Sequence, residues 1–382
     1  QPKLRRRPVA VTNGDKGSCI ITCSYEARAY GIYTGMRFQE GVRLCPQLVR
    51  CPSRPQIYAD ISRKIMHTLH DITPDIEIFS VDEAFLDMTH TYHRFSTPED
   101  LAMHIRYVVW HAVKLPLSIG IGTDKTVAKY AAKYKKPMGI TVIYPEQVAS
   151  VIGPLPVSEL CGVGPGISKF LKKYGAHSCQ DVAKLPVHIL AQRFGYLGRR
   201  IWLMCQGKDP DPVRTQLKKP QSMGHGKILP PGSKGKEIAY KYLCTMAFKL
   251  STRLQQHKLW TKNIRVSIRY YKQPWYSIEH TLLHPTQSYE VFIKLVRNAS
   301  NKVTNTHAIR QVHVGTHTLY EYVQQDMLIT HTTTSNKTED LVQRINKRFG
   351  AGSISPARLC YHKNPEVIAP AWKPDSTRDY IE

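Results

Sequence analysis

The chain has 382 residues, 42% of them hydrophobic, and its 54 lysines and arginines against 29 aspartates and glutamates give a formal net charge of +25. This length is enough for two to four domains, each with its own core. No run of about 18 apolar residues occurs, which argues against a membrane-spanning helix. The basic excess runs across the C-terminal half, so we expect a long nucleic-acid surface and no membrane partner.

The cysteines and the N-terminus bear on the cellular compartment. Nine cysteines, an odd number, include no Cys-x-x-Cys pair, which predicts reduced thiols in a cytoplasmic protein. The first residues contain no signal-peptide core. Gln1 is not an initiator methionine, so we expect that an upstream segment is missing.

A small α/β segment comes first. Strands are predicted at 8–11 and 18–22, followed by a short helix with Ser24 as N-cap and Gly31 as its stop. Tyr25 and Arg28 lie three residues apart and therefore share one face of this helix. A phenol and a guanidinium together suit an anionic ligand such as a phosphate, although an ordinary surface arginine fits the same pattern.

Two adjacent acids lie at the tip of a predicted hairpin. Asp82 and Glu83 separate the apolar runs 76–81 and 84–88, which contain many β-forming residues. Adjacent carboxylates repel each other, so a fold either solvates both or neutralises them with a cation. The local pattern leaves a solvated turn and a metal site as alternatives.

The elements around this hairpin predict an α+β layer. Helices are expected at 57–72, from the N-cap Thr97 to about 113, and at 125–134, with strands at 117–122 and 139–144. We expect helices to cover one face of a mostly antiparallel sheet.

The segment 154–205 is predicted to be mostly helical. Residues 160–171 read as a helix, a glycine-rich hairpin with Gly162, Gly164 and Gly166, and the start of another helix. Backbone amides at a helix N-terminus can bind phosphate independently of sequence, while close helix packing is the alternative reason for the glycines.

After a basic connector at 215–220, the order of predicted elements is βαββαβ over 223–319. The predicted strands carry Arg265 and Arg269 interleaved with aromatic residues, which suits a duplex backbone. Since side chains alternate along a strand, half of these aromatics are expected in the core.

Five motifs in order resemble one family. They are Tyr25-Glu26-Ala27-Arg28, the run from Phe79 to Asp87, Ser118-Ile119-Gly120-Ile121-Gly122, Lys136-Pro137-Met138-Gly139 and Gly162-Val163-Gly164-Pro165-Gly166. The set resembles the bacterial DinB/UmuC group of Y-family, lesion-bypass DNA polymerases over nearly the whole chain. The resemblance implies a multidomain α+β right-hand polymerase with fingers at 1–55, palm at 56–144, thumb with helix-hairpin-helix at 145–213, linker at 214–222, little finger at 223–322 and a C-terminal extension at 323–382.

The resemblance also implies site residues and substrates. Asp82 and Glu83 match two carboxylates of a site for two Mg²⁺ ions, which serve nucleotidyl transfer from a dNTP to a primer 3′-OH on primer-template DNA. Tyr25, Arg28 and Lys136 match residues that hold the dNTP phosphates, Ser80 supports the site, and Ile21 and Gly35 lie near the nascent base pair. For DNA binding we expect Gly162, Gly164, Gly166, Lys169, Arg265 and Arg269.

The sequence departs from the family pattern at its start. Relatives begin with a strand bearing Asp-x-Asp and a steric-gate aromatic, whereas this sequence begins after that point, so we expect impaired activity from the sequence as it stands. A non-catalytic accessory protein that binds primer-template DNA and recruits partners is the alternative. The family's cytoplasmic, nucleoid-associated location and monomeric state are also expected.

A short peptide near the C-terminus is the last expectation. Gln325 and Leu328 match a sliding-clamp-binding peptide whose final aromatic is missing, and a plain linker fits equally well.

Overall fold

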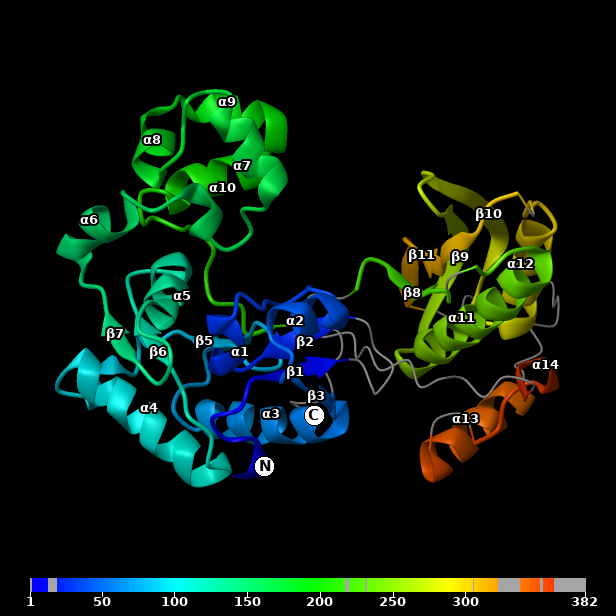
Figure 1. Ribbon diagram of the computed structural model, residues 1–382, viewed down its shortest axis with the longest axis horizontal. Helices are drawn as coiled ribbons and strands as arrows, with labels where there is room; N and C mark the ends of the chain where they lie inside the picture. Colours follow the sequence, from blue (N-terminus) through cyan, green and yellow to red (C-terminus); the bar gives the residue numbers. More distant parts are fainter. Residues whose placement is uncertain are drawn as a thin grey trace, which may run out of the picture. The chain divides into compact units, whose positions relative to one another are not determined.

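The computed structural model (Figure 1) describes residues 2–12, 19–216, 220–230, 232–304, 306–321, 337–350 and 353–360. It divides into two compact units, the first over Gln1–Leu217 and the second over Lys218–Pro365. In these ranges every helix is too short or too polar to cross a bilayer.

The first unit begins with a small three-stranded sheet in the order β2-β1-β3. The central strand β1 pairs with β2 in antiparallel and with β3 in parallel fashion. The predicted cap is confirmed, because Ser24 Oγ accepts a hydrogen bond of 3.3 Å from the Ala27 amide at the start of α1. The elements are η1 (Pro2–Leu4), β1 (Val9–Thr12), β2 (Ile20–Cys23), α1 (Tyr25–Ala29), α2 (Phe38–Leu44) and β3 (Val49–Pro52).

The next segment places two short sheets against helices. The strands β4 and β5 pair antiparallel, whereas β6 and β7 pair parallel. The predicted mostly antiparallel sheet is therefore wrong for β6 and β7, because the helix α5 connects them and a helical crossover returns the chain in the same direction. The elements are α3 (Pro55–His70), β4 (Ile76–Ile78), β5 (Ala84–Leu86), η2 (Tyr92–Arg94), α4 (Pro98–Val113), β6 (Ile119–Ile121), α5 (Lys125–Tyr134) and β7 (Ile140–Val142).

Both short sheets share one apolar core with α3 and α4. Met66 and Leu69 of α3 and Leu101 and Ile105 of α4 are buried in it, and the sheets contribute Ile76 among others. Thr97 caps α4, as predicted, by accepting a hydrogen bond from the Asp100 amide. This core holds the hairpin β4–β5 in place.

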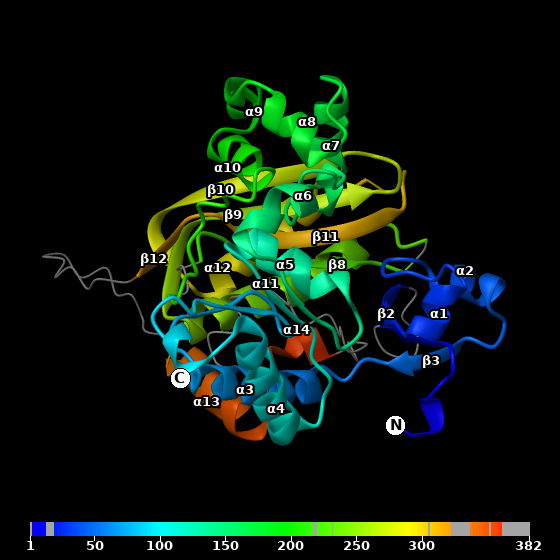
Figure 2. The ribbon, with the colours of Figure 1, turned by 90° about the vertical axis from the view of Figure 1, so that its left-hand side faces the viewer.

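Short helices form a separate cluster within the first unit (Figures 1 and 2). α5 buries Val127 and Ala131 in the same core as Leu171 and Leu190 of this cluster. The helix expected before the glycine hairpin is only the 3-10 turn η4, since Leu160 already has extended backbone. The elements are η3 (Pro145–Gln147), α6 (Val148–Ile152), η4 (Val157–Glu159), α7 (Pro165–Lys172), α8 (Cys179–Lys184), α9 (Val187–Phe194) and α10 (Tyr196–Met204).

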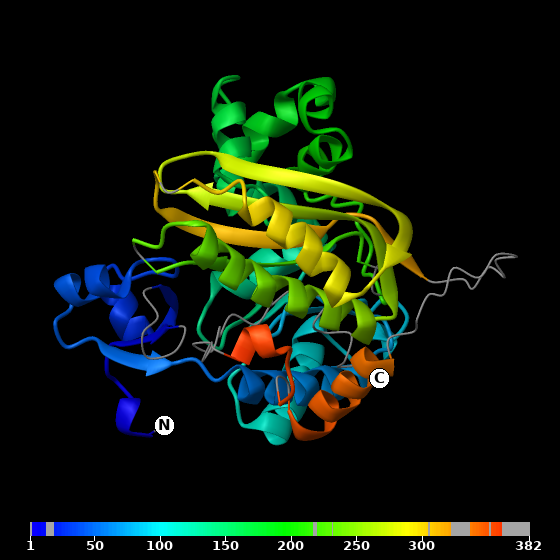
Figure 3. The ribbon, with the colours of Figure 1, turned by 90° about the vertical axis from the view of Figure 1, so that its right-hand side faces the viewer.

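The second unit confirms the βαββαβ order. Its strands pair antiparallel in the order β10-β9-β11-β8, with β12 beside β9. Figure 3 shows α11 and α12 side by side on one face of this sheet, where Ile264, Val266 and Ile268 of β9 are buried. The elements are β8 (Met223–Ile228), α11 (Lys236–Gln256), β9 (Leu259–Tyr270), β10 (Trp275–Thr286), α12 (Tyr289–Ser300), β11 (Ile309–Thr316), β12 (Leu319–Glu321), α13 (Lys337–Phe349) and α14 (Ala357–Cys360).

Candidate active site

The hairpin β4–β5 presents Asp82 and Glu83 in its connecting loop, and both are exposed. The amides of Phe79 and Ser80 each donate a 3.0 Å hydrogen bond to the Glu83 carbonyl, which closes the loop. Ser80 Oγ donates to Asp82 Oδ1 at 2.7 Å and lies 3.5 Å from Glu83 Oε2. One oxygen of each carboxylate therefore lies within 3.5 Å of the same hydroxyl.

A basic side chain that the sequence analysis missed lies beside this pair. Lys129 Nζ, from α5, donates a hydrogen bond of 2.7 Å to Glu83 Oε1. The same nitrogen lies 4.4 Å from the centroid of the Phe79 ring. The only signal in the sequence is the four-residue spacing of lysines in this helix, which does not identify their partners.

The donor set suits a hard divalent cation. Carboxylate oxygens are the ligands that Mg²⁺ prefers, and one or two carboxylates plus substrate phosphates commonly suffice. Within the described ranges no cluster of three or more potential metal-ligating side chains occurs. Asp82 and Glu83 thus offer two carboxylates, so a cation bound there would take its other ligands from water or phosphate oxygens.

The pair on α1 is arranged as predicted. The Arg28 guanidinium carbon lies 5.7 Å from the centroid of the Tyr25 ring, and Arg28 Nε donates to the Cys23 carbonyl at 3.4 Å. Tyr25 is 55% exposed and Arg28 is exposed. Both polar ends are therefore accessible to an anion.

The other predicted nucleotide-site residues lie on neighbouring or separate segments. The Gly35 amide donates a 2.8 Å hydrogen bond to the Ile20 carbonyl, so Gly35 runs beside Ile21 on β2. Lys136 follows α5 and is exposed. Among the described residues no hydrogen bond or ion pair joins Arg28 or Lys136 to Glu83. Arg28 instead bonds to the Cys23 carbonyl, and Glu83 bonds to Lys129.

The glycine hairpin leads into α7 with an open backbone. Gly162 has φ of +87°, a conformation that favours glycine, and Gly164 is the N-cap of α7. A Cβ at Gly162, Gly164 or Gly166 would meet no atom within 4 Å. The glycines therefore do not serve close packing within this unit, and their backbone is open to a ligand.

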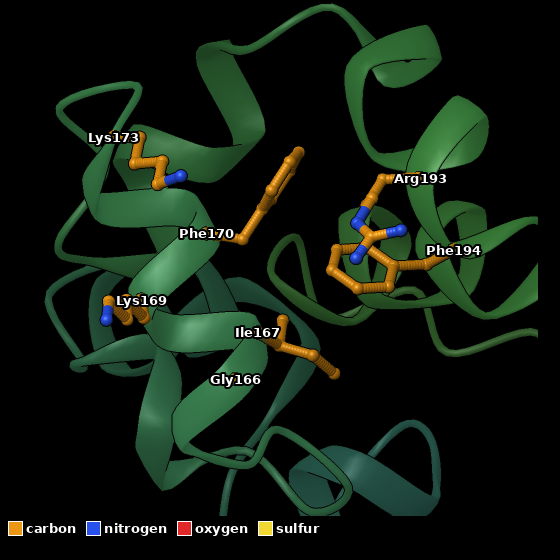
Figure 4. A pocket seen from close by; sticks show the side chains of 7 residues that line it. All are labelled: Gly166, Ile167, Lys169, Phe170, Lys173, Arg193 and Phe194. Atoms are coloured by element: carbon orange, nitrogen blue, oxygen red, sulfur yellow. The ribbon is translucent and has the colours of Figure 1, made fainter.

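A cavity of about 350 Å³ lies beside this hairpin. Figure 4 shows the Phe170 ring projecting between two helical segments toward Arg193 and Phe194. The lining residues include three cations and no acid: Gly166, Ile167, Lys169, Phe170, Lys173, Arg193 and Phe194. Lys169 is thus part of a basic surface next to the glycine hairpin.

The two predicted arginines of the second unit are on the face of β9 opposite the buried Ile264, Val266 and Ile268. Arg265 donates to Glu279 Oε2 from Nε at 3.1 Å and from Nη2 at 2.7 Å. These bonds hold the pKa of Glu279 below its usual value. The Arg269 guanidinium lies 6.0 Å from the centroid of the Trp275 ring.

One further carboxylate and the predicted clamp-binding peptide lie outside this constellation. Asp87 accepts hydrogen bonds from the Thr89 amide and hydroxyl at 3.0 and 2.6 Å, which lower the Asp87 pKa and fit a structural role. Gln325 and Leu328 lie outside the described residues. Their role in clamp binding stays a prediction.

Family models match three parts of the chain. Residues 1–133 match the impB/mucB/samB family, and residues 220–327 match the C-terminal domain of that family. Residues 158–209, which contain the glycine hairpin, match the thumb domain of DNA polymerase-iota.

Curated relatives and solved structures agree with these matches. DNA polymerase IV of Moorella thermoacetica is 34% identical over 75% of this chain and 73% of its own length. DNA polymerase IV of Desulfatibacillum aliphaticivorans is 30% identical over 94% of this chain and 92% of its own length. A Y-family DNA polymerase chimera has the same fold, with a TM-score of 0.70 at 23% identity over 86% of this chain and 94% of its own. The chain therefore belongs to the impB/mucB/samB family of Y-family DNA polymerases, which includes DNA polymerase IV.

Proposed function

We propose that this protein is a template-directed DNA polymerase for translesion synthesis and that Asp82 and Glu83 bind its divalent cations. The observation that carries the proposal is the hairpin loop, where Ser80 Oγ lies 2.7 Å from Asp82 Oδ1 and 3.5 Å from Glu83 Oε2. Two exposed carboxylates converge there in a chain whose relatives are named DNA polymerase IV.

The reaction joins a dNTP to a primer. The primer 3′-oxygen gives its proton to a water molecule and forms a bond to the α-phosphorus, while the bond from that phosphorus to the pyrophosphate oxygen breaks and pyrophosphate leaves. Bound Mg²⁺, two ions in this proposal, stabilises negative charge on the attacking and leaving oxygens. Asp82 and Glu83 hold the cation, and Ser80 orients both carboxylates.

The remaining residues bind substrates. Arg28, Tyr25 and Lys136 offer a forked guanidinium, a phenol and an ammonium to the β- and γ-phosphates, and the positive charges offset the charge that develops on the leaving group. Ile21 and Gly35 lie beside the nascent base pair.

DNA is held without reading its sequence. The backbone at Gly162, Gly164 and Gly166 and the Lys169 ammonium bind phosphates of the duplex. On the second unit, Arg269 and Arg265 also bind DNA phosphates. Arg265 first has to exchange its bonds with Glu279 for bonds to phosphate.

Primer extension across a template lesion tests the proposal. The full-length protein is mixed with the four dNTPs, Mg²⁺ and a primer-template whose template strand carries an abasic site. The proposal expects extended primers whose 3′ end lies beyond the template position of the abasic site. An accessory protein would bind the same DNA and leave every primer at its starting length, which would overturn the proposal.

A further inference from the structure

Lys129 lies between the helix α5 and the proposed metal ligands. Its Nζ is 2.7 Å from Glu83 Oε1 and 4.4 Å from the Phe79 ring centroid. The side chain is only 25% exposed, whereas that of Glu83 is 44% exposed. The ammonium is therefore held on two sides and directed at one carboxylate oxygen.

α5 carries three lysines at four-residue intervals, each paired with an acid from another segment. Lys125 Nζ bonds to Glu77 and Asp211, and Lys133 pairs with Glu159. Of these three lysines, Lys129 is the one whose partner is a proposed metal ligand. This difference gives Lys129 a role that its neighbours on the same helix do not share.

The contact conflicts with cation binding at the same oxygen. Glu83 Oε1 accepts the bond from Lys129, and Glu83 Oε2 faces Ser80 Oγ. A divalent cation at Glu83 would be close to the Lys129 ammonium, and like charges at such a distance repel. Cation binding at Glu83 therefore has to weaken or displace the Lys129 contact.

An incoming nucleotide changes this balance. The triphosphate brings several negative charges, with which the Lys129 ammonium can pair once it leaves Glu83. The repulsion between Lys129 and the cation is then offset by attraction to the phosphates. A cation that arrives with a nucleotide is thereby favoured over a cation that arrives alone.

We propose that Lys129 is a positioning residue that acts as an internal counter-ion of Glu83 and makes divalent-cation binding depend on the nucleotide. The inference rests on the proposed function of Asp82 and Glu83. It gives Lys129 two tasks: it holds the Glu83 side chain in place before substrate binds, and it disfavours early metal binding.

Binding of Mn²⁺, followed by electron paramagnetic resonance on the full-length protein without nucleotide, tests this inference. Removing one positive charge near a divalent ion should tighten binding on the order of tenfold in Lys129→Met. Lys129→Arg keeps the charge and should bind Mn²⁺ as the unaltered protein does. Lys133→Met makes the same charge change one helical turn away, beside Glu159, and should leave the affinity unchanged within about twofold.

A second measurement separates this role from plain stabilisation of the hairpin. With a non-hydrolysable dNTP bound, the advantage of Lys129→Met should disappear, because the charge that it lacks would then pair with phosphate. An Mn²⁺ affinity in Lys129→Met that equals or falls below that of the unaltered protein without nucleotide would overturn the inference. Primer extension by the unaltered protein would still stand in that case, so the two proposals fail separately.

Discussion

Lys125 Nζ donates a 2.7 Å hydrogen bond to Asp211 Oδ2, although 86 residues separate them in the sequence. The same nitrogen donates to Glu77 Oε2 at 2.8 Å, and the Arg214 amide donates to that oxygen as well. Lys125 is 8% exposed. The buried Lys125 ammonium thus links the strand β4, the helix α5 and the segment that follows α10.

Replacing Lys125 by methionine should strongly destabilise the first unit. Asp211 keeps its ion pairs with Arg200 and Arg214, but Glu77 would lose the Lys125 cation. An uncompensated buried charge typically costs about 3–5 kcal/mol. The measurement is the free energy of unfolding in urea, followed by a spectroscopic signal. Lys133→Met is the matched control, because its partner Glu159 is 39% exposed and such a pair contributes about 0–1 kcal/mol. Equal losses in both variants would contradict the role of Lys125.

Stability should fall as the pH drops below about 4, because carboxylates whose pKa is lowered in the folded protein take up protons in the unfolded chain first. Burial raises the pKa of Asp209, but hydrogen bonds from Arg200 and Thr126 outweigh it and leave that pKa below its usual value. Burial also raises the pKa of Asp211, but its hydrogen bond from Lys125 and the nearby charges of Arg200 and Arg214 outweigh burial and leave that pKa below its usual value. Their stabilisation is complete above the unfolded pKa of about 3.9 and is lost as the pH falls through the folded values.

The check is the urea midpoint between about pH 5 and pH 2 in the unaltered protein and in Asp209→Asn. The variant should lose stability overall and show a shallower decline with acid. Asp124, whose pKa burial raises, acts in the opposite direction and reduces the slope. A decline of the same steepness in Asp209→Asn would contradict this assignment.

Much of the fold follows from local sequence signals, and the charged contacts do not. The helix predicted at 125–134 is α5 with the same bounds, and Thr97 caps α4 as expected. Periodicity and caps are local properties, so they can be read along the chain. The pairing of Lys125 with Asp211 has no local pattern, because it depends on how distant segments pack.

The site was predicted in the same partial way. Two adjacent acids between apolar strands predict Asp82 and Glu83 as candidate metal ligands, and the structure places Ser80 beside both. Lys129 was missed, since nothing in its neighbourhood indicates that α5 packs along the hairpin. The parallel pairing of β6 and β7 was also missed, although the helix expected between them is the crossover that parallel neighbours require.

Two substitutions at the glycine hairpin should weaken DNA binding for different reasons. Gly166→Ala adds a methyl group where the protein leaves open space, so folding is preserved while close approach of a phosphate is hindered. Loss of one backbone–phosphate hydrogen bond should lower affinity roughly 2- to 12-fold. Lys169→Gln removes a charge and should reduce the slope of log affinity against log salt concentration by about 0.9, whereas Gly166→Ala should leave that slope unchanged.

Fluorescence anisotropy of a labelled primer-template at several salt concentrations measures both effects. Gln180→Ala, an exposed position on α8, is the control and should change neither quantity. A steeper loss of affinity in Gln180→Ala than in Gly166→Ala would argue against the hairpin as a DNA contact.

Arg28→Lys should raise the KM for dNTP in single-nucleotide incorporation. Lysine keeps the charge but loses the forked pair of donors, and the loss of one charge-assisted bond corresponds to roughly a tenfold change. Arg43→Lys, on the exposed side of α2, makes the same chemical change and should leave KM unaltered. A KM for Arg28→Lys equal to that of the control would remove Arg28 from the nucleotide site.

The central claim is that Asp82 and Glu83 form the metal site, and primer extension by Asp82→Asn and Glu83→Gln in the full-length protein tests it most directly. Each substitution keeps the side-chain shape and removes a charge that holds the cation. Extension should fall roughly a hundredfold or more, because the cation supplies several kcal/mol of transition-state stabilisation. Primer-template affinity should stay within about twofold, and Asp87→Asn, whose carboxylate bonds to Thr89, should still extend primers. Undiminished extension by Asp82→Asn and Glu83→Gln would contradict the account.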